Sequence, residues 1–365
     1  MAVIRYRLMT RRLSTLLLSL ASIVGGCRSI GPGAVAADRV DYSRAIADSW
    51  KRQTLLNIIK LRYSDPPVFV DVGSIVSGYS LETGLSVTGT ALPYMDGDSV
   101  GVQGSGKFTD RPTITYVPMT GNQFVAGLMM PITPESLLFA IQSGWPADVM
   151  LRLGAASING LRNEGATIGS LHAADPRFDR VAELLRSVQA SGAMSVRVLP
   201  GKPGERGTVL VLRGENIAPE VDAEIKELGT LLGLEPARGE YRVAYGSVNV
   251  NGQEIAILTR SLLHVIGTMA ARAELPAADV AQGRAVRGLP PRRTAAGERA
   301  PFIRCSPRPP PGGAAFASVS YRGHWFWIDD RDLLAKREFA FIMLLFTLAD
   351  TGRDPDRPVI TIPAQ

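Results

Sequence analysis

LETGLSVT, residues 81–88, is the stretch that decides the fold class of this chain. Leucine, threonine or valine occupies every second position, and polar residues or glycine occupy the positions between. This period of two is typical of a β-strand with one buried face. A loop rich in glycine and aspartate follows, and strand composition resumes at residues 113–117. The pattern therefore predicts an antiparallel hairpin with arms near residues 79–88 and 100–116.

Helical sequence lies on both sides of this hairpin. Residues 41–63 are expected to form a helix whose later half is apolar nearly all round and is therefore buried. Downstream, helices are expected at residues 121–130, 134–143, 147–163, 177–189, 219–232, 259–273 and 330–350. Short strands are expected at residues 195–199, 208–212, 316–321, 324–328 and 359–362. Asn251-Gly252 is the strongest type of short-range turn signal, and it predicts a second hairpin over residues 241–258.

Segregated blocks of strand and helix favour an α+β fold over a doubly wound sheet. The expected order is an N-terminal helix, an antiparallel β-hairpin region, a helical middle and a mixed α/β C-terminal half. The expected segments are residues 1–26, a signal peptide; 27–40, a lipidated tether; 41–170, the helix, hairpin and helical region; 175–275, an α+β domain; 276–313, a loop or linker rich in proline and arginine; and 314–365, a strand-helix-strand segment that packs on the core.

The first 27 residues carry an export signal. Four arginines precede residue 13, residues 13–24 are almost all apolar or small, and Gly25-Gly26 leads into Cys27. This order is that of a secretory signal peptide. A cysteine directly after two small residues resembles the lipobox of bacterial lipoproteins. The apolar run is shorter than the roughly 20 residues that a membrane-spanning helix needs.

Two details of this signal stay open or are set aside. A conventional cleavage site at residues 34–36, Ala-Val-Ala, lies far beyond the apolar run, so cleavage before Cys27 is preferred. Met1 and Met9 both remain possible starts, because either leaves arginines ahead of the apolar run.

Lipid on Cys27 fixes the expected location. A diacylglyceryl cysteine supplies two acyl chains, which anchor a protein stably without a spanning helix. Arg28 follows the cysteine, where an aspartate would favour retention in the inner membrane by resemblance to the sorting rule of enteric-type bacteria. We therefore expect a protein held on the outer membrane by its N-terminal lipid and facing the periplasm.

Cleavage before Cys27 also changes the charge of the chain. It removes four arginines and leaves 36 basic against 34 acidic residues, so the basic character belongs mainly to the signal. No nucleic-acid partner is expected on this ground. Cys305 is then the one remaining free thiol, which excludes an internal disulfide. It is expected to be a buried small apolar residue rather than an intermolecular link.

Four segments resemble an uncharacterised family of proteobacterial envelope lipoproteins. They are YSDPPVF at residues 63–69, RPTITY at 111–116, YRGHWFWIDDRDL at 321–333 and PVITIP at 358–363. The resemblance covers most of the mature chain and implies an envelope location without a familiar catalytic domain. It carries over no functional residue other than Cys27.

Two surfaces are candidates for binding. Residues 283–313 contain a single acid and seven arginines that can meet anionic lipid or acidic envelope polymers, namely Arg284, Arg287, Arg292, Arg293, Arg299, Arg304 and Arg308. The alternative is a solvated loop stiffened by proline. Trp325 and Trp327 share one face of a predicted strand and can stack a ligand. The alternative is that this strand packs on the apolar helix that follows it.

Catalytic signatures are missing from the sequence. No G-x-S-x-G or H-E-x-x-H motif occurs, and the glycine-rich run at residues 101–107 has Phe108 where a phosphate loop needs serine or threonine. No metal or cofactor is expected. His324 with Asp329, Asp330 or Asp332 is the best acid–base candidate, although Asp330 can simply start a helix.

These observations favour a lipid-anchored, non-enzymatic binding or assembly component of the periplasm, working with the membrane and with other envelope proteins or anionic polymers. The first alternative is a periplasmic hydrolase of cell wall or lipid that uses His324 and the nearby aspartates. The second is an oligomeric outer-membrane pore formed through the hairpin at residues 79–117, since one hairpin alone cannot satisfy its edges in lipid.

Overall fold

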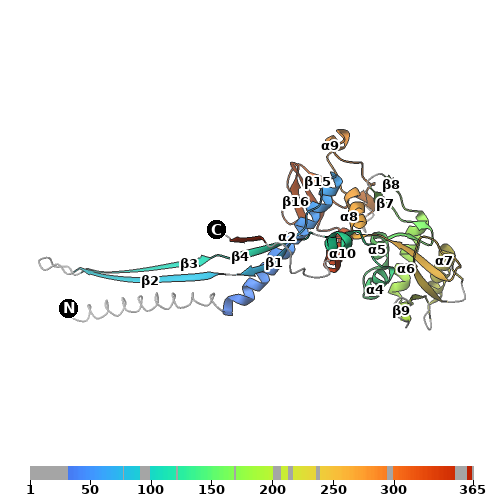
Figure 1. Ribbon diagram of the computed structural model, residues 1–365, viewed down its shortest axis with the longest axis horizontal. Helices are drawn as coiled ribbons and strands as arrows, with labels where there is room; N and C mark the ends of the chain where they lie inside the picture. The colour runs from blue at the N-terminus through green and yellow to red at the C-terminus, as the bar shows by residue number, and fades with distance from the viewer. Residues whose placement is uncertain are drawn as a thin grey trace, which may run out of the picture. The chain divides into compact units, whose positions relative to one another are not determined.

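A computed structural model describes most of the chain as an α+β protein, which confirms the predicted fold class (Figure 1). It describes residues 32–76, 78–90, 99–120, 122–167, 170–199, 207–212, 217–235, 239–293, 299–349 and 360–363. The predicted signal peptide and Cys27 lie outside these residues. Within them, no helix is both long enough and apolar enough to span a membrane.

The chain divides into two compact units. The first unit contains the described parts of Met1–Trp50, Val70–Pro118 and Asp356–Gln365, and the second those of Lys51–Phe69 and Met119–Pro355. Helix α2, Pro32–Arg62, contributes to both. It begins with proline, whose fixed φ suits a first helical position. Residues 32–40 of the predicted tether are therefore helical.

The first unit is built on long antiparallel strands. Strands β1 (Val70–Val76), β4 (Thr113–Pro118) and β18 (Ile360–Pro363) form a sheet in the order β1-β4-β18. Strands β2 (Tyr79–Thr90) and β3 (Ser99–Asp110) form a separate two-stranded ribbon. The predicted hairpin is confirmed as β2 and β3, whereas residues 113–116 of its predicted second arm belong to β4 in the other sheet.

A six-stranded mixed sheet organises one part of the second unit. Its order is β6-β5-β12-β11-β10-β9, from Leu161–Arg162, Ala155–Ile158, Glu254–Thr259, Glu240–Tyr245, Gly207–Leu212 and Met194–Leu199. Helix α4 (Pro134–Gln142) packs on β9, β11 and β12. The core beneath it contains fully buried side chains such as Leu151 and Phe178.

The predicted hairpin at residues 241–258 is wrong, because β11 and β12 pair in parallel, with Arg242 opposite Glu254 and Tyr245 opposite Ile257. The tight hairpin turns need positive φ at the first central residue (type II′) or at both (type I′), and here only the second, Gly252, has it. The side chain of Asn249 instead accepts the backbone amides of Asn251 and Gly252 at 2.9 and 2.8 Å. The loop folds back on itself, and β12 lies between β11 and β5.

The predicted helix at residues 147–163 is also wrong in its second half. Helix α5 spans only Ala147–Gly154, and β5 and β6 follow as a hairpin in which Ile158 pairs with Leu161. Asn159 and Gly160 form its two-residue turn with φ of 44° and 85°. This Asn-Gly pair forms the kind of tight turn that the sequence predicts at residues 251–252.

Helices with strong local signals begin and end where predicted. Helix α6 (Pro176–Ala190) has Asp175 as its N-cap, and α7 (Pro219–Leu232) begins with proline and ends at Gly233 with φ of 64°. Helix α8 (Leu262–Ala271) starts later than expected, because Ser261 rather than Thr259 is its N-cap. Thr259 is instead the last residue of β12.

A three-stranded sheet and a long helix complete the second unit. The strand order is β15-β17-β16, from Arg304–Ser306, His324–Asp329 and Ala315–Tyr321, and α10 spans Leu333–Ala349. The helix does not begin at Asp330. Asp332 accepts the amide of Ala335, and Asp330 pairs with Lys336 at 2.7 Å.

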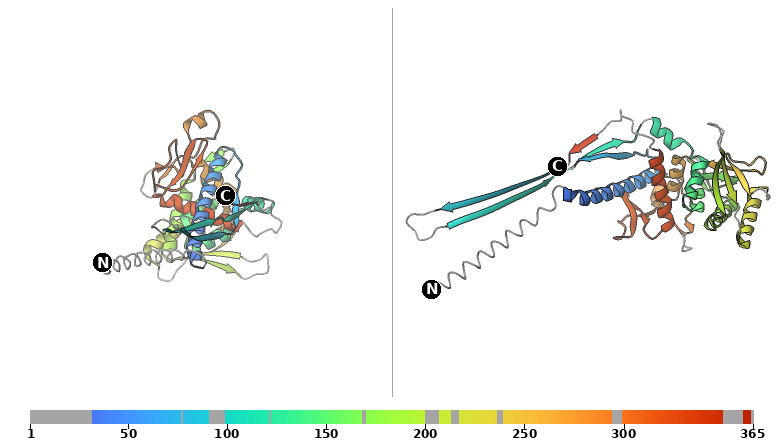
Figure 2. Two further views of the ribbon diagram at one scale, coloured as in Figure 1. Left: turned by 90° about the vertical axis from the view of Figure 1, so that its left-hand side faces the viewer. Right: turned by 90° about the horizontal axis from the view of Figure 1, so that it is seen from below.

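The shorter elements are α3 (Asn122–Met129), α9 (Ala277–Ala281), the hairpin of β7 (Gly165–Thr167) with β8 (Ser170–His172), and the pair β13 (Arg292–Arg293) with β14 (Arg299–Ala300). Figure 2 shows the same elements from two further directions.

Candidate ligand-binding pocket

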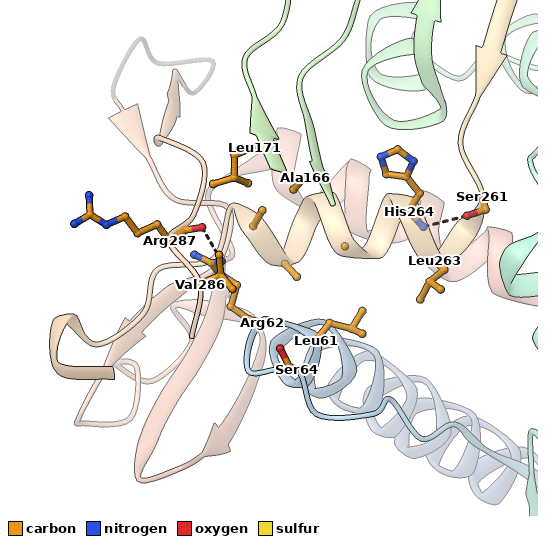
Figure 3. A pocket seen from close by; sticks show the side chains of 13 residues that line it. Leu61, Arg62, Ser64, Ala166, Leu171, Ser261, Leu263, His264, Val286 and Arg287 are labelled. Atoms are coloured by element: carbon orange, nitrogen blue, oxygen red, sulfur yellow. Dashed lines mark hydrogen bonds between the residues drawn. The ribbon is translucent and has the colours of Figure 1, made fainter. Parts of the chain in front are cut away.

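A pocket of about 630 Å³ lies along one side of α8 (Figure 3). The end of α2, the β7–β8 hairpin and the segment at residues 286–287 form its other walls. Most of its lining is apolar, and the larger contributors are Leu61, Ala166, Leu171, Leu263 and Val286. All these residues belong to the second unit.

Helix α8 turns two different faces to its surroundings. Val265, Ile266 and Met269 are almost fully buried in the core. Leu263 and Gly267 lie one turn apart on the pocket side, which follows from the 3.6-residue period of a helix. An ideal Cβ on Gly267 would have only Ala166 O near it, at 3.9 Å. The glycine therefore leaves part of the pocket empty rather than allowing a close backbone contact.

His264 gives the pocket a neutral polar group. Its backbone amide donates to Ser261 Oγ at 3.2 Å, which fixes the first turn of α8 (Figure 3). Its Nε2 is buried and has no hydrogen-bond partner among the described residues. Burial, reinforced by the charge of Arg260, lowers the pKa of His264 to about 4. The ring is therefore uncharged at neutral pH.

Arg62 closes one end of the pocket and is 7% exposed. Its guanidinium donates from Nη1 to Arg287 O at 3.0 Å, and burial lowers its pKa. Leu289 N donates to Ala271 O at 2.7 Å, which holds the same segment against α8. Gly288 permits this approach, because a Cβ there would lie 2.4 Å from Ala271 O and 2.5 Å from Arg62 Nη2.

The mouth of the pocket exposes apolar side chains. Leu171 is 40% and Val286 55% exposed, and Arg287 is exposed beside them. Pockets of roughly 300–1,000 Å³ with apolar walls and a few polar groups are the usual sites for small molecules. No carboxylate lines the described part of this pocket, while two arginines do. The arrangement suits an apolar ligand that is neutral or anionic and disfavours a cation.

A second cleft, of about 1,020 Å³, carries charges that already pair with one another. Arg152 forms an ion pair with Asp179, and Arg186 lies 3.8 Å from Asp148. These pairs leave the cleft with little net charge to recognise a ligand.

The two tryptophans lie on one face of β17, the middle strand of its sheet. Phe326 and Ile328 on the other face are fully buried, whereas Trp325 and Trp327 are half-buried. Trp327 pairs with Arg304 on β15. The alternation expected from the sequence is therefore confirmed, and the core contacts come from phenylalanine and isoleucine rather than from tryptophan.

His324 and the nearby aspartates do not meet. His324 begins β17, and its Nδ1 lies 3.3 Å from Arg322 O. Asp329 ends the same strand and forms ion pairs with Arg331 and Arg304. No group of three histidine, cysteine or acidic side chains suited to a metal occurs among the described residues. Burial raises the pKa of Cys305 to about 12, so this half-buried thiol stays protonated at neutral pH.

The seven arginines of the predicted basic loop take different roles. Arg284 and Arg304 form ion pairs with Asp279 and Asp329, at 3.6 and 3.2 Å. Arg287 lines the pocket and Arg308 is exposed. The backbones of Arg292, Arg293 and Arg299 belong to β13 and β14, and their side chains are outside the description.

The described parts of the sequence segments at residues 63–69, 111–116, 321–333 and 358–363 meet in two pairs. In the first unit, β18 pairs with β4, with Ile360 opposite Tyr116. In the second, Tyr321 and Arg322 both donate to the carboxylate of Asp65, and the Arg322 guanidinium lies 4.8 Å from the ring centre of Tyr63. These hydrogen bonds hold the pKa of Asp65 below its usual value. Both pairs connect segments more than 240 residues apart in the sequence.

Sequence reasoning missed most of the pocket. The helix predicted at residues 259–273 contains His264 and is confirmed as α8 with a later start, but no role was identified for Arg62, Leu171 or Gly288. These residues come from three distant segments, so no local pattern links them. Comparison with known protein families, with curated proteins and with solved structures found no match.

Proposed function

We propose that this chain is an exported, lipid-anchored envelope protein that binds an apolar, neutral or anionic ligand in the α8 pocket and catalyses no reaction. The pocket is the observation that carries the binding role. Its walls are apolar, its histidine is neutral, and its charged lining residues are arginines. The signal sequence ending in Cys27 supports the envelope location.

The binding role can be tested by filling the pocket from α8. We would measure binding of cis-parinaric acid, a fluorescent fatty acid, to the mature chain carrying Cys27→Ser. Gly267→Leu should reduce binding at least tenfold, because the new side chain projects into the cavity. Gly267→Ala is the matched control: it adds one carbon where there is room, favours the helix, and should bind nearly normally.

Equal binding by Gly267→Leu and the unaltered chain would refute the assignment of the pocket. Loss of binding in Gly267→Ala as well would also count against it, because a methyl group leaves most of the cavity open.

The anchor is tested separately at Cys27. The unaltered protein should incorporate palmitate and fractionate with the outer membrane, and Cys27→Ser should do neither. Mass spectrometry that found a free thiol on Cys27, or a mature chain beginning after residue 36, would contradict the lipid anchor.

A further inference from the structure

The β2–β3 ribbon has a regular ladder of paired residues. Its pairs run without interruption from Tyr79–Asp110 to Thr90–Ser99. No other described helix or strand packs along it, and both figures show the two strands extending together beyond β1 and β4 (Figures 1 and 2). At roughly 3.3 Å per residue, its 12-residue strands are about 40 Å long.

The register gives this ribbon two faces of opposite character. On one face, Leu81 is placed opposite Phe108 and Val87 opposite Val102, with Leu85 between them opposite a glycine. On this face, residues 81, 83, 85, 87 and 89 of β2 and their partners on β3 are all apolar residues, threonine or glycine.

The other face of the ribbon is polar. Glu82 is opposite Lys107, and Ser86 is opposite Gln103. Glu82, Ser86 and Lys107 are exposed. The charges of the opposed glutamate and lysine offset each other.

Such a ribbon is not a stable end state in water. Two strands without a third strand or a helix are marginally stable at best. Each outer edge offers unpaired N–H and C=O groups to another strand. No other described helix or strand packs against the apolar face, and an apolar face without a packing partner marks a site of association. A partner must therefore pair with the backbone groups of both outer edges and cover the apolar face.

We propose that β2–β3 ribbons from several copies of this chain pair edge to edge into a closed ring of strands whose apolar face contacts membrane hydrocarbon. A single additional copy would leave one edge of each ribbon open, whereas a cyclic assembly of identical copies pairs every edge. Closure is also what hydrocarbon requires, because an open sheet edge is not tolerated there.

The dimensions and the polar face agree with this arrangement. A membrane strand needs about 9–11 residues when tilted, and each arm has 12. The polar face, which carries Glu82 and Lys107, then lines a water-filled interior. This inference uses no residue of the α8 pocket, so either proposal can fail without the other.

The test compares charges placed on neighbouring positions of opposite faces. Purified full-length mature protein would be added to phosphatidylethanolamine–phosphatidylglycerol vesicles loaded with a small fluorescent dye. Leu85→Arg puts a charge on the apolar face and Ser86→Arg puts the same charge on the polar face. We expect Leu85→Arg to reduce dye release at least tenfold, whereas Ser86→Arg should still release dye and shift the pore toward anions.

Oligomer formation and folding are measured on the same samples. The unaltered protein in detergent should sediment as a ring of several copies that resists SDS until heated, and Leu85→Arg should not. Circular dichroism and urea unfolding of each variant show whether the rest of the chain remains folded. A monomer by sedimentation, equal dye release by the two variants, or a soluble dimer that releases no dye would each overturn the proposal.

Discussion

A buried ion cluster beside α8 gives the sharpest stability prediction. Arg272 is 4% exposed and lies 3.5 Å from the carboxylate of Glu338, which is completely buried. Arg272 also pairs with Glu164, whose side chain is 18% exposed. Replacing one member of a buried pair leaves the other charge uncompensated in a medium that solvates it poorly.

Arg272→Leu should therefore lower the free energy of unfolding by about 3–5 kcal/mol. For a unit of this size, each kcal/mol corresponds to a shift of roughly 2–4 °C, so the melting temperature should fall by about 10 °C. Urea unfolding followed by circular dichroism, together with calorimetry, measures both quantities. The matched control is Lys226→Leu, which breaks an exposed pair with Asp222 and should cost less than about 0.5 kcal/mol.

The double variant Arg272→Leu/Glu338→Leu separates charge burial from lost packing. It should be more stable than Arg272→Leu alone, because it also removes the buried carboxylate that has lost its ion pair with Arg272. Glu164 remains in both variants and is partly solvated. The reasoning fails if Arg272→Leu costs no more than Lys226→Leu, or if the double variant is less stable than the single one.

Three further predictions concern the pocket and the turns. The free energy of unfolding should decline as pH falls from 6.5 to about 4, because His264 takes up a proton in the unfolded chain over this range and stays neutral in the folded chain. Urea titrations should show a weaker dependence of the unfolding free energy on pH for His264→Gln. Asn159→Ala should lower the free energy of unfolding by roughly 1–3 kcal/mol, because Asn159 has left-handed backbone geometry and its side chain donates to Leu232 O and accepts from Ala256 N. Asn251→Ala should be nearly neutral by the same assay. Gly288→Ala should weaken cis-parinaric acid binding, because its Cβ would collide with Ala271 O; unchanged affinity would show that this segment does not shape the pocket.

Local signals predicted those elements whose ends are defined by neighbouring residues. Asp175-Pro176 begins α6, and Gly233 ends α7, because caps and positive φ are satisfied within one turn of the chain. The two Asn-Gly pairs mark the limit of this reasoning. Asn159-Gly160 forms a tight hairpin turn, whereas residues 251–252 belong to a loop between parallel strands. The dipeptide is the same, and the strands that flank it differ in their partners.

The sequence by itself determined the α+β class, the alternation along residues 81–88, and the two faces of β17, because periodicity depends only on the spacing of residues along the chain. The tertiary structure alone decided where β12 lies, which motifs meet at Asp65, and that α2, α8 and the β7–β8 hairpin enclose a pocket. These features join residues about 100 or more positions apart. Their free energy comes from burial and pairing between segments, which no local pattern records.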